Sequence, residues 1–282
     1  MIATKLHCCR KSLAIVLLWA ASALCVAATP EPARPELRVL LVGNSLVYVN
    51  NLPGLLRALA AAQPDGPRIA TATYAAPGGT IAERWKDGKV SAALAARPWD
   101  AIVLQERGGL LACLVERERR QQRECRDSER AHKAFAGQAA SRDARTLLLS
   151  TWGPDETWQL KLDRAIRLLA SRIAPADTPA TIIPAGSTLR SFATRHSQAA
   201  TFPDGVHPSI QASLIIAAQL YRALTGRDAQ AVDITIDVAL LPVNALVKPE
   251  MPLEQQPQLA GDGNTVVIKA ATLAPLLQAA RP

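Results

Sequence analysis

Two segments at opposite ends of the sequence carry residue types suited to nucleophilic catalysis. Ser45 lies in Gly43-Asn44-Ser45-Leu46, directly after an apolar run, where the end of a strand would expose its hydroxyl. Asp204 lies three residues before His207 and can accept a hydrogen bond from one ring nitrogen. The other nitrogen is then free to take a proton from a hydroxyl. Each segment also has a plain structural interpretation, with Ser45 as a helix N-cap and Asp204 in an Asx turn beside a surface histidine.

Further residues could stabilise the negative charge that such a reaction creates on oxygen. Pro77-Gly78-Gly79-Thr80 follows the second apolar run, and glycines let backbone N–H groups approach a substrate closely. Gln105 ends the third run, and its side-chain amide is a second kind of donor. A plain turn and a capping amide are the structural alternatives. Trp152, after the fourth run, either lines a pocket or belongs to the core.

Two other histidines are weaker candidates for the base. His196, which precedes Ser197, and His132, in a charged stretch, both lie away from the expected strand ends. We therefore favour His207.

The elements that must position these groups alternate along the chain. Short apolar runs predict five strands, and stretches with helical periodicity separate them. Such alternation predicts an α/β fold with a doubly wound parallel sheet, whose functional groups gather at the carboxyl ends of the strands. The strands are expected at residues 37–42, 69–74, 101–104, 146–150 and 180–183, and the helices near residues 53–59, at 81–96 (broken), 158–173 and 208–224.

Three motifs in this order resemble the SGNH (GDSL-like) serine hydrolases. Gly43-Asn44-Ser45-Leu46 is similar to their first block, Gly78-Gly79-Thr80 to the glycine block, and Asp204-Gly205-Val206-His207 to the last block. The resemblance implies a flavodoxin-like three-layer α/β/α fold with a five-stranded parallel sheet, and ester hydrolysis without a metal or organic cofactor. It also implies that Ser45 is the nucleophile and an oxyanion donor, that Gly78 is a second donor, and that His207 and Asp204 complete a triad.

The sequence departs from the family pattern at two places. Asn44 replaces the commoner aspartate of the first block, and Leu104-Gln105-Glu106 stands where a G-x-N-D block is usual. Gln105 would then replace the oxyanion asparagine, and Asn44, Gly79 and Trp152 are expected to line the pocket.

The first 28 residues have the layout of a secretory signal peptide. Three basic residues precede an apolar run from Leu13 to Ala28, which ends in small side chains. An uncleaved membrane anchor is the alternative, but the run is marginal for a span. We therefore expect an exported protein, periplasmic or secreted, without a stable membrane span after cleavage. The expected divisions are a signal peptide (1–28), a linker (29–36), the hydrolase domain (37–228) and a C-terminal extension (229–282) with two short β-like runs.

The cysteines and the charge distribution limit the kinds of metal site and binding partner that the protein can have. Export would leave Cys113 and Cys125, which predict one disulfide in an oxidising compartment. No cysteine or histidine spacing typical of zinc is present. Aromatic residues make up only 4% of the sequence, and the formal net charge of +8 is scattered, which argues against a nucleic-acid partner. The charged run from Glu116 to Arg130 is typical of a solvated helix face, within a long segment (108–131) expected to be an insertion or lid.

These features predict a serine esterase for small acyl esters, such as acetyl esters, on a carbohydrate or cell-envelope substrate. An O-acyltransferase would use the same residues with a sugar hydroxyl in place of water. A glycan-binding module that keeps the fold without catalysis is the alternative from a different class.

Overall fold

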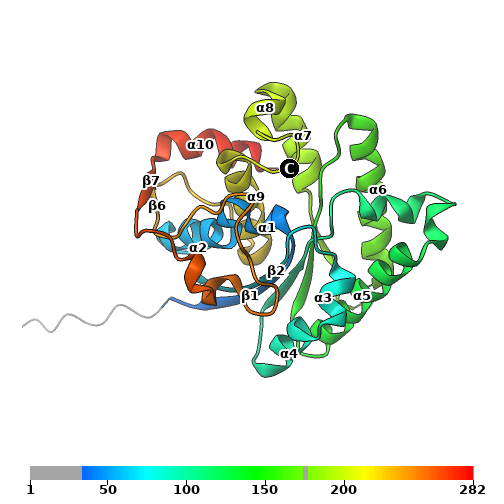
Figure 1. The fold of residues 1–282 in the computed structure, drawn as a ribbon. Helices are drawn as coiled ribbons and strands as arrows, with labels where there is room; N and C mark the ends of the chain where they lie inside the picture. Colours follow the sequence, from blue (N-terminus) through cyan, green and yellow to red (C-terminus); the bar gives the residue numbers. More distant parts are fainter. Residues whose placement is uncertain (1–33, 174–176, 282) are drawn as a thin grey trace, which may run out of the picture. The chain divides into compact units, whose positions relative to one another are not determined.

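A five-stranded parallel sheet lies at the centre of the chain (Figure 1). The structure, a computed structural model, describes residues 34–173 and 177–281, and the predicted signal peptide lies outside them. The strands are β1 (Glu36–Gly43), β2 (Arg68–Ala75), β3 (Ala101–Leu104), β4 (Arg145–Leu149), β5 (Thr181–Ile183), β6 (Ile234–Ile236) and β7 (Val266–Ile268). The α-helices are α1 (Ser45–Tyr48), α2 (Leu52–Ala62), α3 (Ile81–Lys86), α4 (Lys89–Ala96), α5 (Arg123–Ala140), α6 (Glu156–Ile173), α7 (Ala185–Arg195), α8 (Gln198–Thr201), α9 (Ile210–Thr225) and α10 (Ala270–Ala279).

The order of the strands confirms the predicted fold class. The sheet runs β2-β1-β3-β4-β5 with every neighbouring pair parallel, which is the flavodoxin-like order of a doubly wound sheet. Val42 lies opposite Tyr74 on one side and Leu104 on the other, and Leu104 lies opposite Leu148. Because these strands end level with one another, the loops that follow them meet at one edge of the sheet.

Alternation along β1 explains why the sheet has helices on both faces. Val39 and Leu41 belong to an apolar cluster with α2 and α9, whereas Leu40 and Val42 belong to a second cluster with α3 and α5. All four side chains are buried. Successive strand residues point to opposite faces, so a continuous apolar run is what a strand covered on both faces requires. Figure 1 shows the two helical layers on either side of the sheet.

The last large helix begins later than the sequence suggests. Pro208 was expected at the first helical position, and this prediction is wrong. Helix α9 begins at Ile210, because the Ser209 hydroxyl accepts a hydrogen bond from the Ala212 N–H at 3.3 Å and caps the helix. His207 therefore lies on the turn before that cap, outside the helix.

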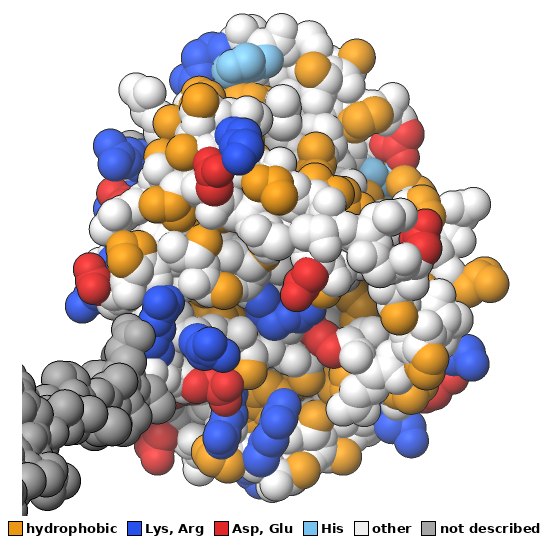
Figure 2. Space-filling view, turned by 90° about the vertical axis from the view of Figure 1, so that its left-hand side faces the viewer, with side chains coloured by type: hydrophobic (Ala, Val, Ile, Leu, Met, Phe, Trp, Pro, Cys, Tyr) orange, Lys and Arg blue, Asp and Glu red, His pale blue; other side chains and the backbone are white. Residues whose placement is uncertain are grey.

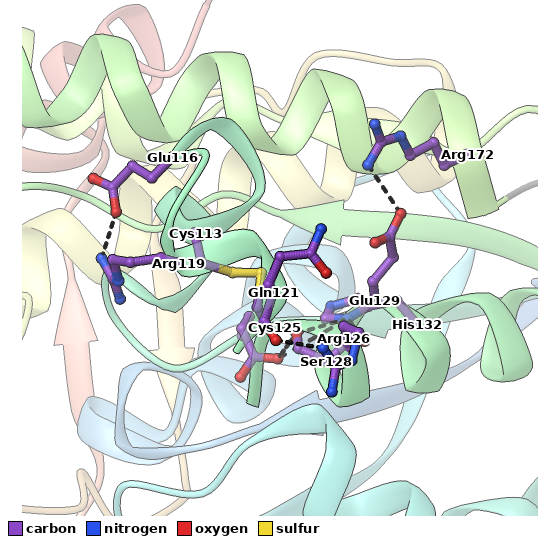
Figure 3. Close-up of a disulfide and its surroundings, with 11 residues drawn as sticks. Cys113, Glu116, Arg119, Gln121, Cys125, Arg126, Ser128, Glu129, His132 and Arg172 are labelled. Carbon is purple, nitrogen blue, oxygen red and sulfur yellow. Dashed lines mark hydrogen bonds and ion pairs between the residues drawn. A yellow bond between two sulfur atoms is a disulfide. The ribbon is translucent and has the colours of Figure 1, made fainter. Parts of the chain in front are cut away.

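The segment between β3 and α5 is fastened to the body of the protein. Residues 110–115 form a 3-10 turn in which Leu110 to Leu114 are buried, so this part is a packed element. A disulfide joins Cys113 to Cys125 in the first turn of α5, as predicted, and Figure 3 shows it among surface ion pairs. These pairs include Glu116 with Arg119, and Glu129 with Arg172 on α6.

The C-terminal extension packs against the same domain. β6 and β7 form an antiparallel pair, and Ile234 and Ile236 share the apolar cluster of α2 and α9 with Leu273 of α10. Between them, the Glu254 carboxylate accepts hydrogen bonds from the N–H and the hydroxyl of Thr73, both at 2.8 Å, and so covers the edge strand β2. On this side of the molecule, acidic and basic side chains are interspersed (Figure 2). No helix in the described ranges is long and apolar enough to cross a bilayer.

Candidate active site

Ser45 is the first residue of α1, directly beyond β1. The preceding residue, Asn44, caps the helix, because its side-chain oxygen accepts a hydrogen bond from the Leu46 N–H at 3.1 Å. The capping role considered for Ser45 therefore belongs to Asn44. The Ser45 hydroxyl is left free to interact with another part of the chain.

The turn between α8 and α9 places the Asp204 carboxylate against the His207 ring. One carboxylate oxygen accepts hydrogen bonds from the backbone N–H groups of Val206 at 2.9 Å and His207 at 2.7 Å. The other oxygen lies 2.7 Å from His207 Nδ1. Gly205 has a φ of +83°, in the left-handed region that glycine adopts without strain. One oxygen of Asp204 therefore forms the Asx turn, and the other oxygen orients the His207 ring.

His207 Nε2 lies 2.9 Å from Ser45 Oγ, although 162 residues separate the two along the chain. A carboxylate only accepts hydrogen bonds, so the proton of a neutral His207 is on Nδ1 and its bare Nε2 faces the serine hydroxyl. The histidine side chain is 15% exposed and that of Asp204 is 44% exposed. The geometry is that of a serine, a general base and an orienting carboxylate within reach of solvent.

The charge of Asp204 is held by its hydrogen bonds. Partial burial opposes ionisation, but the N–H groups of His207 and Val206 and the His207 ring outweigh it and lower the pKa of Asp204 to about 2. The carboxyl is therefore ionised at neutral pH. An anion at this position would stabilise an imidazolium if His207 took up a proton.

The glycine loop lies next to the serine because Asn44 binds it. The Asn44 amide donates to the Gly79 carbonyl at 3.1 Å, and the Gly79 N–H is used within the turn, where it donates to Ala76 at 3.0 Å. Gly78 has a φ of +61°, which explains a glycine there. Within the described part of the chain, neither the Gly78 N–H nor the Ser45 N–H donates a hydrogen bond to another group. Two adjacent loops therefore each present an unused N–H group.

Gln105 contributes differently from a free donor. Its side chain is 1% exposed, its oxygen accepts from the Asn44 N–H at 3.2 Å, and its amide nitrogen donates to the Glu106 carbonyl. The amide thus ties the end of β3 to the loop that carries Ser45.

Two further residues hold the histidine turn. Trp152 donates from Nε1 to the Val206 carbonyl at 2.7 Å, and its ring stacks on Phe202 with the centroids 5.5 Å apart. Asn50 donates to the Pro208 carbonyl at 2.7 Å and so links the serine segment to the histidine segment. The sequence pattern alone did not single out Asn50. The signal available was the Asn50-Asn51 pair, both with positive φ, since asparagine tolerates this conformation in turns.

The alternative bases lie elsewhere. His132 is 1% exposed within α5, and its Nδ1 donates to the Ser128 carbonyl at 2.8 Å. His196 lies at the end of α7, where its ring stacks on Phe192. The described hydrogen-bond partner of Ser45 Oγ is His207.

Comparison with known proteins gives similarity at the level of the fold. The sequence matches no family model and no curated protein. The structure is similar to LAE5, an α/β hydrolase from the metagenome of Lake Arreo, Spain, with 15% identity and a TM-score of 0.51 over 68% of this chain and 96% of that one. It is also similar to a catalytic mutant of Axe2, an acetylxylan esterase from Geobacillus stearothermophilus, with 15% identity and a TM-score of 0.50 over 68% of this chain and 95% of that one.

Proposed function

We propose that this chain is a serine ester hydrolase of the SGNH (GDSL-like) type, acting on small acyl esters of a carbohydrate or cell-envelope molecule. The observation that carries the proposal is the hydrogen-bond chain from Ser45 Oγ to His207 Nε2 (2.9 Å) and from His207 Nδ1 to Asp204 (2.7 Å). Both distances are within the range required for proton transfer between a nucleophile and its base.

In the first half of the reaction, His207 Nε2 takes the hydroxyl proton as Ser45 Oγ attacks the ester carbonyl. The tetrahedral intermediate collapses, the ester C–O bond breaks, and the imidazolium returns the proton to the departing alkoxide. An acyl group then remains on Ser45 and the alcohol leaves.

The negative charge that forms on the carbonyl oxygen needs donors already in place. The unused N–H groups of Ser45 and Gly78 fit this role, with the Asn44 amide holding the two loops together. Gln105 supports them from the end of β3 by its bond to the Asn44 N–H. In the second half, His207 deprotonates a water molecule, which attacks the acyl-enzyme, and the acid and free Ser45 are released.

The fold and the expected location support the proposed substrate class. One of the solved structures with this fold is an acetylxylan esterase, which favours an acetyl ester on a sugar. The Cys113–Cys125 disulfide is compatible with export. The reaction needs no metal or organic cofactor, and we expect neither a nucleic-acid nor a membrane-embedded substrate.

The direct test is the hydrolysis of 4-nitrophenyl acetate by Ser45→Ala. We expect kcat to fall by about 10⁴–10⁶-fold, because no other group replaces the nucleophile. Ser141→Ala, which changes an exposed serine at the end of α5, is the matched control and should keep full activity. Full activity in Ser45→Ala would end the proposal.

Two other functions could use the same fold. Analysis of the reaction products and of glycan binding distinguishes each of them from ester hydrolysis. An O-acyltransferase would transfer the acetyl group to an added sugar, so acetylated sugar in place of acetate would indicate transfer. Tight glycan binding by a protein that never hydrolyses an ester would indicate a binding module.

A further inference from the structure

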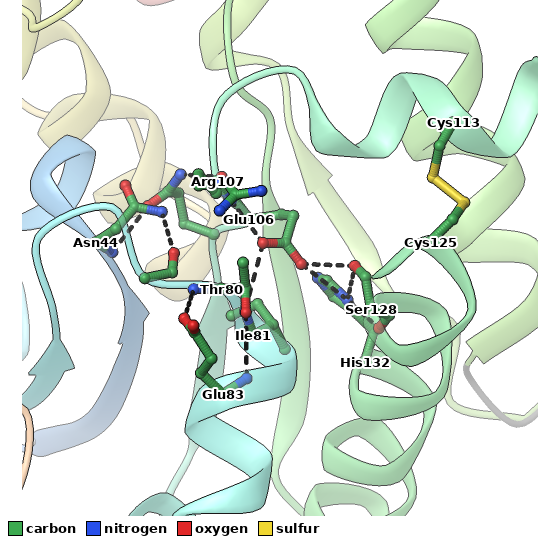
Figure 4. Close-up of polar contacts among 12 residues, drawn as sticks. Asn44, Thr80, Ile81, Glu83, Glu106, Arg107, Cys113, Cys125, Ser128 and His132 are labelled. Carbon is green, nitrogen blue, oxygen red and sulfur yellow. Dashed lines mark hydrogen bonds and ion pairs between the residues drawn. A yellow bond between two sulfur atoms is a disulfide. The ribbon is translucent and has the colours of Figure 1, made fainter. Parts of the chain in front are cut away.

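A second polar cluster lies inside the protein, beside the glycine loop. Glu106, at the end of β3, accepts a hydrogen bond from the Ser128 hydroxyl of α5 at 2.6 Å. His132, one turn further along α5, has its Nδ1 4.0 Å from the same carboxylate oxygen. All three residues are 1% exposed. Figure 4 shows Ser128 and His132 of α5 turned toward Glu106. Polar side chains at this depth reduce stability unless they are fully bonded, so a role is expected for them.

The other oxygen of Glu106 binds the backbone of two loops. It accepts from the Arg107 N–H at 2.7 Å and from the Ile81 N–H at 3.4 Å. Ile81 is the first residue of α3 and lies three residues after Gly78. Glu106 therefore holds the far end of the glycine loop, whereas Asn44 holds its middle at the Gly79 carbonyl.

Ser128, which binds Glu106 from α5, is itself held in place by the disulfide. Ser128 lies three residues after Cys125, and the disulfide ties that first turn of α5 to Cys113, in the segment that follows Glu106 (Figures 3 and 4). The cluster thus connects the glycine loop to α5, a long helix packed against the sheet, and so fixes the position of the loop.

We propose that Glu106 is a positioning residue for the oxyanion hole, a role that rests on the proposed esterase function. Gln105 binds the Asn44 N–H, next to Ser45, and Glu106 binds the Ile81 N–H, close to Gly78. Two successive residues at the end of β3 therefore reach the two loops that present the oxyanion donors. The Leu104-Gln105-Glu106 segment sets the separation of these donors from inside the sheet.

The proposal predicts an effect on kcat with little effect on KM. Oxyanion donors act only when they already lie about 2.7–3.1 Å from the developing charge, so a small loop movement weakens transition-state binding. Glu106 is 1% exposed, so a substrate at the surface should not reach it and ground-state binding should change little.

The experiment compares four variants of the full chain with 4-nitrophenyl acetate. Glu106→Ala should lower kcat by about 10²-fold with KM within about threefold of the wild type. Glu106→Gln should stay within about tenfold, because its amide oxygen can still accept from Ile81 and Arg107 while its nitrogen donates to Ser128. Ser128→Ala should lower kcat by about tenfold. Ser91→Ala, whose buried hydroxyl has no hydrogen-bond partner among the described residues, is the control and should leave kcat unchanged.

A boronic acid supplies a second readout, because its tetrahedral adduct with serine places an oxygen where the oxyanion forms. Affinity for phenylboronic acid should weaken in Glu106→Ala by the same factor as kcat/KM. If Glu106→Ala does not fold, Ser128→Ala and Glu106→Gln decide the question by the effects stated above.

Two results would overturn the positioning role while leaving the esterase intact: an unchanged kcat in folded Glu106→Ala, or a Glu106→Gln variant as slow as Glu106→Ala. Ser45→Ala, measured in parallel, separates the two proposals. An active Ser45→Ala would remove the esterase function and the positioning role with it.

Discussion

The molecule contains two groups of serine, histidine and carboxylate, and they are built in opposite ways. At the surface, His207 lies between Ser45 and Asp204 and contacts both through its two ring nitrogens. In the interior, the hydroxyl of Ser128 donates to Glu106, and His132 turns its Nδ1 to a backbone carbonyl. His132 Nδ1 also lies 3.5 Å from the Ser128 hydroxyl, but it carries the proton that it donates to the Ser128 carbonyl. Only the first arrangement therefore offers an unprotonated ring nitrogen to a hydroxyl. The order of the hydrogen bonds, more than the residue types, decides which group can carry out proton transfer.

Burial gives the two groups different charges. Hydrogen bonds lower the pKa of Asp204 to about 2, so it stays anionic beside its histidine. Burial raises the pKa of Glu106 to about 7 and lowers that of His132 to about 4. The surface group is suited to stabilise a charge that appears during a reaction, whereas the interior group disfavours charge and is suited to hold backbone.

Asp204→Asn should have the largest effect of the changes that break this contrast. The amide nitrogen would face His207 Nδ1 and donate to it, which moves the ring proton to Nε2 and removes the acceptor for Ser45. We expect kcat to fall by about 10²–10⁴-fold. Steady-state kinetics measure it, with Asp262→Asn on an exposed loop as the control. A loss below threefold would show that Asp204 does not orient the base.

Removal of the disulfide should be the next largest effect, on stability. The bridge closes a loop with a sequence separation of 12, so Cys113→Ser with Cys125→Ser should lower the free energy of unfolding by about 3 kcal/mol. Urea denaturation measures the change. Unfolding at the same urea concentration as the wild type would mean that packing alone holds the start of α5.

Trp152→Phe should have a smaller effect on the surface group. It keeps an aromatic ring against Phe202 but removes the hydrogen bond to the Val206 carbonyl. One such bond contributes about 1 kcal/mol, so we expect kcat to fall about fivefold as the histidine turn loosens. Trp99→Phe, which removes an indole hydrogen bond far from the triad in sequence, is the matched control and should keep full activity. Equal activity in Trp152→Phe and Trp99→Phe would assign Trp152 to packing alone.

The interior group should also make stability depend on pH. Glu106, with its raised pKa, contributes stability in acid that is lost as pH rises through about 7. His132, with its lowered pKa, contributes stability above about 6.5 that is lost as pH falls toward about 4. The two opposing slopes overlap between about pH 4.5 and 6.5.

His132→Asn leaves only the Glu106 contribution in that interval. Its Tm, relative to the wild type, should rise as pH falls from 6.5 to 4, because the folded variant no longer holds a neutral histidine that the unfolded chain would protonate. Contributions from other groups cancel in this difference. Parallel Tm curves for the two proteins would contradict the lowered pKa of His132.

The sequence predicted those parts of the structure that local pattern controls. The apolar run of β1 identified a strand buried on both faces, and the strand–helix alternation identified the fold. The segment with Ser45 could be singled out because it follows a strand whose end was visible. The segment with His207 could be singled out because it precedes a helix, predicted from residue 208 and observed from Ile210. Cys113 and Cys125 were paired correctly because export would leave no other cysteine.

Contacts between distant segments could not be predicted in the same way. Glu106 reaches Ser128 on one side and Ile81 on the other, and no spacing rule relates these positions. Glu254 covers β2 through a contact with Thr73, 181 positions earlier, so the place of the extension depends on the complete fold. Pro208 was misplaced because Ser209, a better cap, follows it directly.

Covalent labelling tests the central claim, that the surface group alone is reactive. A fluorophosphonate that forms an adduct with activated serines would be added to the wild type and to His207→Ala, and the digested protein mapped by mass spectrometry. Under this claim, we expect stoichiometric modification of Ser45 in the wild type, none of Ser128, and a rate at Ser45 reduced by about 10³-fold or more in His207→Ala. An unmodified Ser45 in an active wild-type enzyme, or labelling that does not depend on His207, would contradict it.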